Sequence, residues 1–466
     1  MIDHKNFRRI VVFHRLLSRG ALKLAVAGLV FAAVLMSTAH AQRRVVVGSD
    51  DRKVDAAARA EIIDEVTEAL NEVYIFPEKA AEMEELVRFK LKEGAYDDVT
   101  SLMAFSELLT RDLRAICKDR HLRVMPSAPR SETEEQGPSP DEERAQRLAE
   151  QRYRNFGFEK VERLAGNIGY IDLRMFADAA DGGDTAIAAL NFLAHCDALI
   201  VDLRQNGGGS PSMIQLISSY LFDEPQHLNS FYIRNTDTTR QFWTHALVEG
   251  PRLSDVPVYV LTSRFTFSAA EEFTYNLKNM ERATIIGETT GGGAHPVEFR
   301  RFVDCGVEMS LPYGRAISPI TKTNWEGTGI APHIKVSAPE ALDVARLEAM
   351  KKLVDQVTDG GKKKMIEWAM KTLEAARNPV SLSPGKLKPF VGVFGPRTIT
   401  LEKGSLFYKR DNRPGYELVP MGGDLFGLNG LEYFRIQFVR DGSGKVSKLV
   451  GLYDNGLSDT NDRSGG

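Results

Sequence analysis

The chain of 466 residues carries 60 basic and 63 acidic side chains, a formal net charge of −3 with histidine neutral. This length is sufficient for two or three domains with at least one large core. The near balance of charge argues against the strongly basic surfaces of nucleic-acid-binding proteins, so we expect no nucleic-acid partner.

The N-terminal segment has the composition of an export signal. Basic residues precede the apolar run LAVAGLVFAAVLM, and Ala39-His40-Ala41 supplies small residues at a cleavage site. Residues 1–41 are therefore predicted to be a secretory signal peptide cleaved after Ala41, with an uncleaved membrane anchor as the alternative. The basic residues are typical of bacterial export, which indicates a periplasmic or secreted protein. No later stretch is apolar enough to cross a bilayer, so we expect no membrane association after cleavage.

The three cysteines, Cys117, Cys196 and Cys305, do not form a disulfide framework, although an oxidising compartment would allow one bridge. Cys196 lies within an apolar stretch and is expected to be a small buried side chain.

Residues 42–126 are predicted to form a helical N-terminal subdomain. Pro77 begins one of its helices and Gly94 ends it. The segment SLMAFSELLTRDLRAICK has its leucines on one face, and DRHLRVMP then reads as a helix end that turns into a short strand. Residues 127–157, rich in Pro, Ser, Glu and Gln, are predicted to be a polar linker.

From residue 158 the pattern alternates between buried strands and helices, so residues 158–340 are predicted to be an α/β domain. GNIGYIDLRMF, ALIVDLR, VYVL and ATIIG are the expected strands. Residues 341–380 are expected to be a helical connector. Residues 385–466 show short alternating strands and regular turns, which predict a small all-β domain.

Ser268 lies where the turn TSRFTF becomes the predicted helix AAEEFTYNLKNM. That position exposes a side-chain oxygen at the positive end of a helix, next to the backbone N–H of Ala269. A nucleophilic serine needs this arrangement. The alternative is that Ser268 only caps the helix, because Glu271 three residues later completes a capping box.

A glycine-rich turn, Asp202–Gly209 (DLRQNGGG), follows a buried strand. Its exposed amides suit an oxyanion hole or an anion cradle, while a plain strand-to-helix turn is the alternative. The spacing required for a phosphate-binding loop is absent.

Three histidines are candidates for a general base. His121 follows the helical segment, His295 comes directly after the glycine-rich loop ETTGGGA, and the weaker candidate His333 stands next to Pro332. Cys117 and His121 form a C-x3-H pair, which is weak evidence for a metal site without a third ligand. Glu326, within NWEGTG, is either a carboxylate in a cleft or a solvated turn residue.

The motifs DLRQNGGG, TSRFTFSAAEEF, RATIIGETTGGGA and NWEGTGIAP occur in this order over about residues 60–340. This arrangement resembles the C-terminal-processing (tail-specific) serine peptidase superfamily, and most of all its branch with the interphotoreceptor retinoid-binding protein modules and the tricorn protease core. The resemblance implies an α/β fold with a crotonase/ClpP-like ββα core. It also implies Ser268 as nucleophile, His121 as general base and Glu326 as the supporting acid, with Gly208 and Ala269 as oxyanion donors.

The sequence departs from the tail-specific branch at Gly293, where the resemblance places that branch's basic lysine. This departure removes a Ser-Lys mechanism and favours histidine, whose pKa near neutrality suits a base for a serine hydroxyl. The loop between the helical part and the α/β core is also too short for an inserted PDZ-like module.

The sequence therefore predicts an exported serine peptidase that hydrolyses peptides or unfolded proteins without a metal or other cofactor. The alternatives are a non-catalytic binding protein for lipid or retinoid-like ligands, and an esterase on the same scaffold. The choice between His121 and His295 as base, the substrate preference and the oligomeric state stay open.

Overall fold

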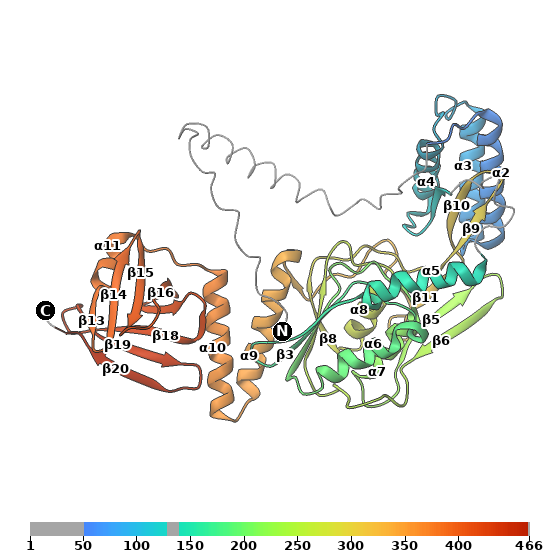
Figure 1. Cartoon of the computed structure of the whole chain (residues 1–466). Helices are drawn as coiled ribbons and strands as arrows, with labels where there is room; N and C mark the ends of the chain where they lie inside the picture. Colours follow the sequence, from blue (N-terminus) through green and yellow to red (C-terminus); the bar gives the residue numbers. More distant parts are fainter. Residues whose placement is uncertain (1–50, 128–138, 465–466) are drawn as a thin grey trace, which may run out of the picture. The chain divides into compact units, whose positions relative to one another are not determined.

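The computed structural model describes residues 51–127 and 139–464 (Figure 1). The predicted signal peptide lies outside these residues. Within the described part of the chain, no helix is both long enough and apolar enough to span a bilayer.

Three helices form the N-terminal region, as predicted: α2 (Ala56–Val73), α3 (Pro77–Lys92) and α4 (Leu102–Cys117). The side chains of Asp55 and Ser101 cap α2 and α4 by accepting hydrogen bonds from backbone N–H groups of the first turn. The apolar helix faces pack on a small sheet with the order β1-β10-β9. Its strands are β1 (Arg123–Pro126), β9 (Val297–Phe302) and β10 (Val307–Pro312). Strands β9 and β10 form an antiparallel hairpin that packs with the helical region, although both strands come from within the α/β part of the sequence (Figure 1).

The predicted polar linker, residues 127–157, contains a helix that composition did not reveal. Helix α5 (Pro140–Tyr153) begins at a capping box formed by Ser139 and Glu142, and acidic residues fill its first turn. These local interactions stabilise a helix that has no buried apolar face. The sequence-based prediction of helices relied on such a face and therefore did not find α5.

The α/β domain is built on a six-stranded sheet with the order β12-β8-β7-β4-β3-β2. Strands β3 (Ile168–Leu173), β4 (Ala198–Asp202), β7 (Val258–Thr262), β8 (Ala283–Gly287) and β12 (Ile334–Lys335) are parallel, and β2 (Phe158–Leu164) is antiparallel. Helices α6 (Ala179–Phe192), α7 (Pro211–Ser219) and α8 (Ala269–Asn279) pack on one face, and α9 (Ala341–Gln356) packs on the other. The loops after β4, β7 and β8 leave from the carboxyl ends of neighbouring parallel strands, the edge where α/β sheets usually form sites.

A three-stranded sheet with the order β11-β5-β6 lies beside this edge and contributes to the cavity described below. It contains β5 (His227–Ile233), β6 (Thr238–Trp243) and β11 (Gly314–Ile317). Strand β6 was not predicted from the sequence, because its residues are mostly exposed and form no apolar run.

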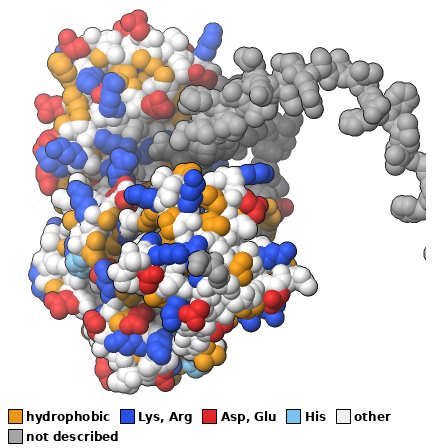
Figure 2. All heavy atoms as spheres, turned by 90° about the vertical axis from the view of Figure 1, so that its left-hand side faces the viewer, with side chains coloured by type: hydrophobic (Ala, Val, Ile, Leu, Met, Phe, Trp, Pro, Cys, Tyr) orange, Lys and Arg blue, Asp and Glu red, His pale blue; other side chains and the backbone are white. Residues whose placement is uncertain are grey.

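After α10 (Gly360–Arg377) and the short α11 (Pro384–Leu387), the C-terminal region is an eight-stranded antiparallel sheet, which confirms the all-β prediction. Its strands are β13 (Gly392–Phe394), β14 (Arg397–Glu402), β15 (Ser405–Arg410), β16 (Tyr416–Pro420), β17 (Leu425–Leu428), β18 (Leu431–Arg440), β19 (Val446–Tyr453) and β20 (Ser458–Asp462). A bridge between Phe394 and Arg463 joins the two ends of the sheet in a barrel-like closure. Basic and acidic side chains are interspersed on the face shown in Figure 2.

Candidate active site

Ser268 has an unusual backbone conformation at the start of α8. Its φ of 54° and ψ of −123° lie in a region that residues with a side chain rarely adopt. Strain of this kind is found where a nucleophile is presented on a sharp turn between a strand and a helix. The capping-box geometry with Glu271 is also present, so Ser268 both begins the helix and faces the site.

The glycine turn after β4 passes directly beside Ser268. A Cβ atom at Gly208 would lie 2.8 Å from the Cβ of Ser268, so only glycine allows this approach. Buried Asn206 fixes the turn, because its backbone carbonyl accepts from the N–H of Phe267 at 3.1 Å. The N–H of Gly208, a predicted oxyanion donor, itself donates to Oδ1 of Asn206 at 2.9 Å.

Glu271 connects Ser268 to the glycine loop after β8. Its carboxylate accepts from the backbone N–H groups of Ser268 (3.0 Å), Gly292 (2.7 Å) and Gly293 (2.8 Å), and from the hydroxyl of Thr290. Burial raises the pKa of this carboxyl, and the hydrogen bonds oppose that shift. The sequence reading treated Glu271 as a helix cap only, and spacing could not reveal its contacts with a loop about 20 residues further on.

His121 reaches the site from the turn between α4 and β1. Its ring centroid lies 4.6 Å from that of Phe267, the residue before Ser268. The backbone N–H of His121 donates to Oδ1 of Asp119 at 3.0 Å, which holds the turn in place. The structure thus brings the N-terminal region next to the predicted nucleophile. Among the described residues, neither His121 nor His295 forms a hydrogen bond with Ser268; such bonds are often long without substrate and tighten during reaction.

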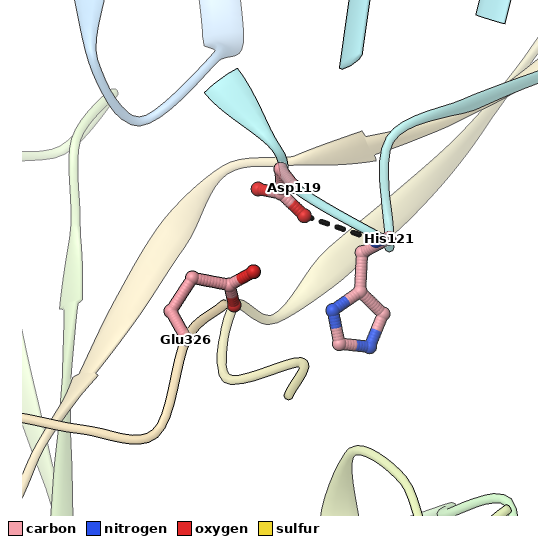
Figure 3. Close-up of side chains that lie close together, drawn as sticks. All are labelled: Asp119, His121 and Glu326. Carbon is pink, nitrogen blue, oxygen red and sulfur yellow. Dashed lines mark hydrogen bonds between the residues drawn. The ribbon is translucent and has the colours of Figure 1, made fainter. Parts of the chain in front are cut away.

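Glu326 lies beside His121 and Asp119, as Figure 3 shows. One ligand atom from each of these three side chains lies within 4.8 Å of the others. Oε2 of Glu326 accepts from the N–H of Ala294 at 2.5 Å, whereas Oε1 of Glu326 and Nδ1 of His121 are buried and have no hydrogen-bond partner among the described residues. In Figure 3 this ring nitrogen faces the Glu326 carboxylate. Two carboxylates and an imidazole could also bind a divalent cation, so the cluster has a second chemical interpretation.

Burial sets the protonation states of this pair. It lowers the pKa of the His121 imidazole to about 4, against an opposing effect of Asp119. Burial, together with the neighbouring Asp119 charge, raises the pKa of the Glu326 carboxyl to about 7. At neutral pH His121 is therefore uncharged and able to accept a proton.

His295, the other candidate base, is paired with Asp119. Its Nδ1 lies 2.6 Å from Oδ2 of Asp119, and both side chains are almost completely buried. Burial opposes both charges, but the hydrogen bond lowers the pKa of Asp119 and raises that of His295. The third candidate, His333, is separate from this cluster: its Nδ1 accepts from the N–H of Ile285 in β8.

Gly293, where the resemblance places the lysine of the tail-specific branch, leaves no room for a side chain. A Cβ atom there would collide with the ring of Phe267 and lie 2.7 Å from Cε1 of His121. The rings of Phe267 and His121 thus fill the space that a side chain at 293 would need. This arrangement supports the inference from the sequence that a histidine, and not a lysine at position 293, is the general base.

A cavity of about 390 Å³ adjoins Ser268. It is lined by the turn after β4, by the start of α8, by the glycine loop and by strands β5 and β6. Ser268, Ala269, His295 and Trp325 are among its lining residues, and so is the buried acid Glu272. The cavity could therefore hold the part of a substrate that is next to the reacting bond.

The other sequence candidates have structural roles. The three cysteines are free. The Sγ of Cys117 contacts backbone groups of Leu113 and Asp119, and Cys117 is not part of the cluster of Asp119, His121 and Glu326. The carboxylate of Asp202 is bound by Arg204 and by the hydroxyl of Tyr170.

Comparison with known proteins gives two family matches. Residues 167–336 match the model of peptidase family S41, and residues 56–155 match the model described as the N-terminal domain of Peptidase_S41 in eukaryotic IRBP. The tricorn protease of Thermoplasma volcanium is 26% identical over 189 residues, which are 38% of this chain and 16% of that protein. The chain thus spans about a sixth of the length of this relative.

Two solved structures illustrate the likeness. The photosystem II D1 C-terminal processing protease is 22% identical with a TM-score of 0.31, covering 37% of this chain and 42% of that chain. The tricorn protease structure is 14% identical with a TM-score of 0.38, covering 68% of this chain and 37% of that chain. From the two matched regions, which follow each other along the sequence, we conclude that the chain belongs to peptidase family S41, a family of serine peptidases.

Proposed function

We propose that this protein is an exported serine peptidase that hydrolyses peptides or unfolded protein segments. The observation that carries the proposal is the buried pair of unpartnered atoms, Nδ1 of His121 and Oε1 of Glu326, beside the strained turn of Ser268. Unpartnered buried polar atoms are costly, and they commonly persist at sites that perform chemistry.

In the proposed reaction, Ser268 attacks the substrate carbonyl carbon while His121 takes the hydroxyl proton. Glu326 accepts a hydrogen bond from Nδ1 of His121, which directs the other ring nitrogen at Ser268 and stabilises the imidazolium that forms. The imidazolium then protonates the leaving amine. A water molecule, activated by the same base, hydrolyses the acyl-enzyme.

The N–H of Ala269, at the start of α8, would stabilise the tetrahedral oxyanion together with the glycine turn after β4. Gly208 can serve as the second donor if it shares or releases its bond to Asn206. Gly209 lines the same cavity as Ser268 and Ala269, so the turn offers a neighbouring amide at the same place.

The direct test is the Ser268→Ala variant, measured with quenched-fluorescent peptides and with an unfolded protein. We expect loss of hydrolysis by at least about 10⁴-fold with an unchanged thermal unfolding midpoint. Hydrolysis at the wild-type rate would refute the proposal. Parallel ester substrates separate a peptidase from an esterase, since an esterase would cleave the esters and leave every peptide intact.

Export is part of the proposal, because the N-terminal composition fits a bacterial signal peptide. N-terminal sequencing of protein from the native cell envelope should give a chain that begins at Gln42. A chain beginning at Met1 would contradict cleavage.

A further inference from the structure

Glu272 is a buried acid in the cavity beside Ser268 that the proposed mechanism does not use. It lies on α8 with 3% of its surface exposed, and it lines the cavity. The side chain of Asn229 lies close enough to favour the charged form of its carboxyl group, but no described cation forms an ion pair with it. A buried carboxyl group is costly unless something pairs with it.

Two buried carboxamides accompany Glu272. Asn229 on β5 is 1% exposed, and Asn276, one helical turn after Glu272, is 3% exposed. The amide nitrogen and oxygen of both side chains have no partner among the described residues. Of these three buried side chains Glu272 lines the cavity, so its carboxyl group is the acceptor that a donor group in the cavity could reach.

We infer that Glu272 forms the base of the primary specificity pocket and selects a lysine or arginine side chain next to the scissile bond. This inference rests on the proposed peptidase function. An ammonium or guanidinium group has only donors, which matches the carboxylate of Glu272. The apolar wall residues Phe231, Ile233 and Phe242 suit the methylene stem of such a side chain.

The other charges that line the cavity do not cancel this preference. Asp178 and Arg240 are exposed, have opposite signs and are screened by solvent. The imidazole of His295 is paired with Asp119. Within the described part of the chain, Glu272 is thus the one buried acid that lines the cavity without a cationic partner.

The preference should depend on pH in a defined direction. Burial raises the pKa of the Glu272 carboxyl to about 8, opposed by the side chain of Asn229. Below that pH the Glu272 carboxyl group is protonated in the protein without substrate, so binding of a cationic side chain must displace the proton. The advantage of a basic substrate therefore grows as pH rises towards about 8 and then levels off.

The test uses quenched peptides that differ only in one residue next to the scissile bond, either lysine, glutamine or norleucine, placed on each side in turn. For the full chain we expect kcat/KM for the lysine peptide to exceed that for the norleucine peptide by at least about tenfold. Glu272→Gln should remove this ratio and its pH dependence. Glu224→Gln, which neutralises an exposed acid, is the matched control and should keep both.

A binding experiment separates this inference from the proposed function. In the Ser268→Ala background, fluorescence anisotropy should show tighter binding of the lysine peptide than of the norleucine peptide, and Glu272→Gln should abolish the difference. Equal binding in this background, or an unchanged kcat/KM ratio in Glu272→Gln, would overturn the specificity pocket. Absence of hydrolysis by the wild-type chain together with selective lysine binding would overturn the peptidase proposal and retain the pocket.

Discussion

Residues that are far apart in the sequence lie close together at this site. His121 and Glu326 come from opposite ends of the S41-like region, yet the burial of both places their pKa values at about 4 and about 7, the reverse of the order in water.

The pH dependence of catalysis should report this pair. Activity requires an unprotonated base and a charged Glu326, so kcat/KM should rise with pH through an apparent pKa near 7. Glu326→Gln should lower the maximum by about 10²-fold and move the acid limb towards pH 4, where His121 alone would titrate. An acid limb that stays near 7 in Glu326→Gln would assign that titration to another group. Glu326→Asp, which retains the charge, is the conservative control.

The buried Asp119–His295 pair should contribute mainly to stability. Replacing His295 with Gln leaves the Asp119 charge uncompensated, so the free energy of unfolding should fall by about 3–5 kcal/mol. Asp119 has a lowered pKa, so its contribution disappears as pH falls below about 4; His295 has a raised pKa, so its contribution disappears as pH rises above about 6.5. Urea unfolding should therefore show the largest loss between these two pH values. A loss that is the same at pH 9 as at pH 5.5 would contradict this account.

Sequence reasoning identified Ser268, His121 and Glu326 as residue types with a chemical role, but it could not choose between His121 and His295. Both imidazoles lie near the site, and the difference is their partners: Asp119 takes Nδ1 of His295 and leaves Nδ1 of His121 unpaired. Asp119 stood in the motif beside His121 without an assigned role. Its contact with His295 spans 176 residues, and a single sequence carries no signal of such a pairing.

At the scale of elements, the glycine loop after β8 connects the three parts of the site. Its carbonyl at Gly291 accepts from Arg120, its amides donate to Glu271, and the carbonyl of Gly293 accepts from the indole of Trp325. The helical region, α8 and the segment that contains Glu326 are thus held through one short stretch of backbone.

Gly293→Ala should disturb this loop without unfolding the domain. The added methyl group would meet the rings of Phe267 and His121, so the imidazole would shift from its position. Displacement of a catalytic group by about 1 Å can reduce the rate about 10²-fold, and we expect a loss of that order in peptide hydrolysis. Gly360→Ala in α10, where a Cβ meets no atom within 4 Å, is the control and should keep full activity. Full activity of Gly293→Ala would show that the loop has more space than the structure indicates.

The elements that the sequence predicted well are those with strong local signals. Buried apolar runs marked β3, β4, β7 and β8, and amphipathic periodicity marked the three N-terminal helices. The predictions failed where the elements are exposed: β6 is mostly exposed, and α5 buries no apolar face. Local sequence also could not show that the β9–β10 hairpin packs on the N-terminal helices.

At the scale of the whole molecule, helices α9 and α10 connect the two β-containing regions. Helix α9 packs on the α/β sheet, whereas α10 contacts the C-terminal barrel through Trp368. Arg435 of β18 stacks on this indole at 3.6 Å, and the indole N–H donates to the carbonyl of Glu432.

Arg435→Met should loosen this contact and leave the chemistry intact. Loss of the cation–π contact and of the hydrogen bonds to α10 should reduce the stability of the C-terminal region by about 2 kcal/mol. Calorimetry should show the lower unfolding midpoint, with peptide hydrolysis unchanged at 25 °C. Arg413→Met, at an exposed turn, is the control. A parallel fall in hydrolysis would indicate that the barrel also takes part in substrate handling.

The central claim is that folding brings His121 to Ser268 as its base. The most direct measurement is the second-order rate constant for fluorophosphonate labelling, with the modified residue identified by mass spectrometry, in wild type, His121→Ala and His295→Gln. We predict labelling at Ser268 in the wild type, a loss of about 10²–10⁴-fold in His121→Ala, and a much smaller loss in folded His295→Gln. Labelling of His121→Ala at the wild-type rate, with labelling lost in His295→Gln, would contradict the account and make His295 the base.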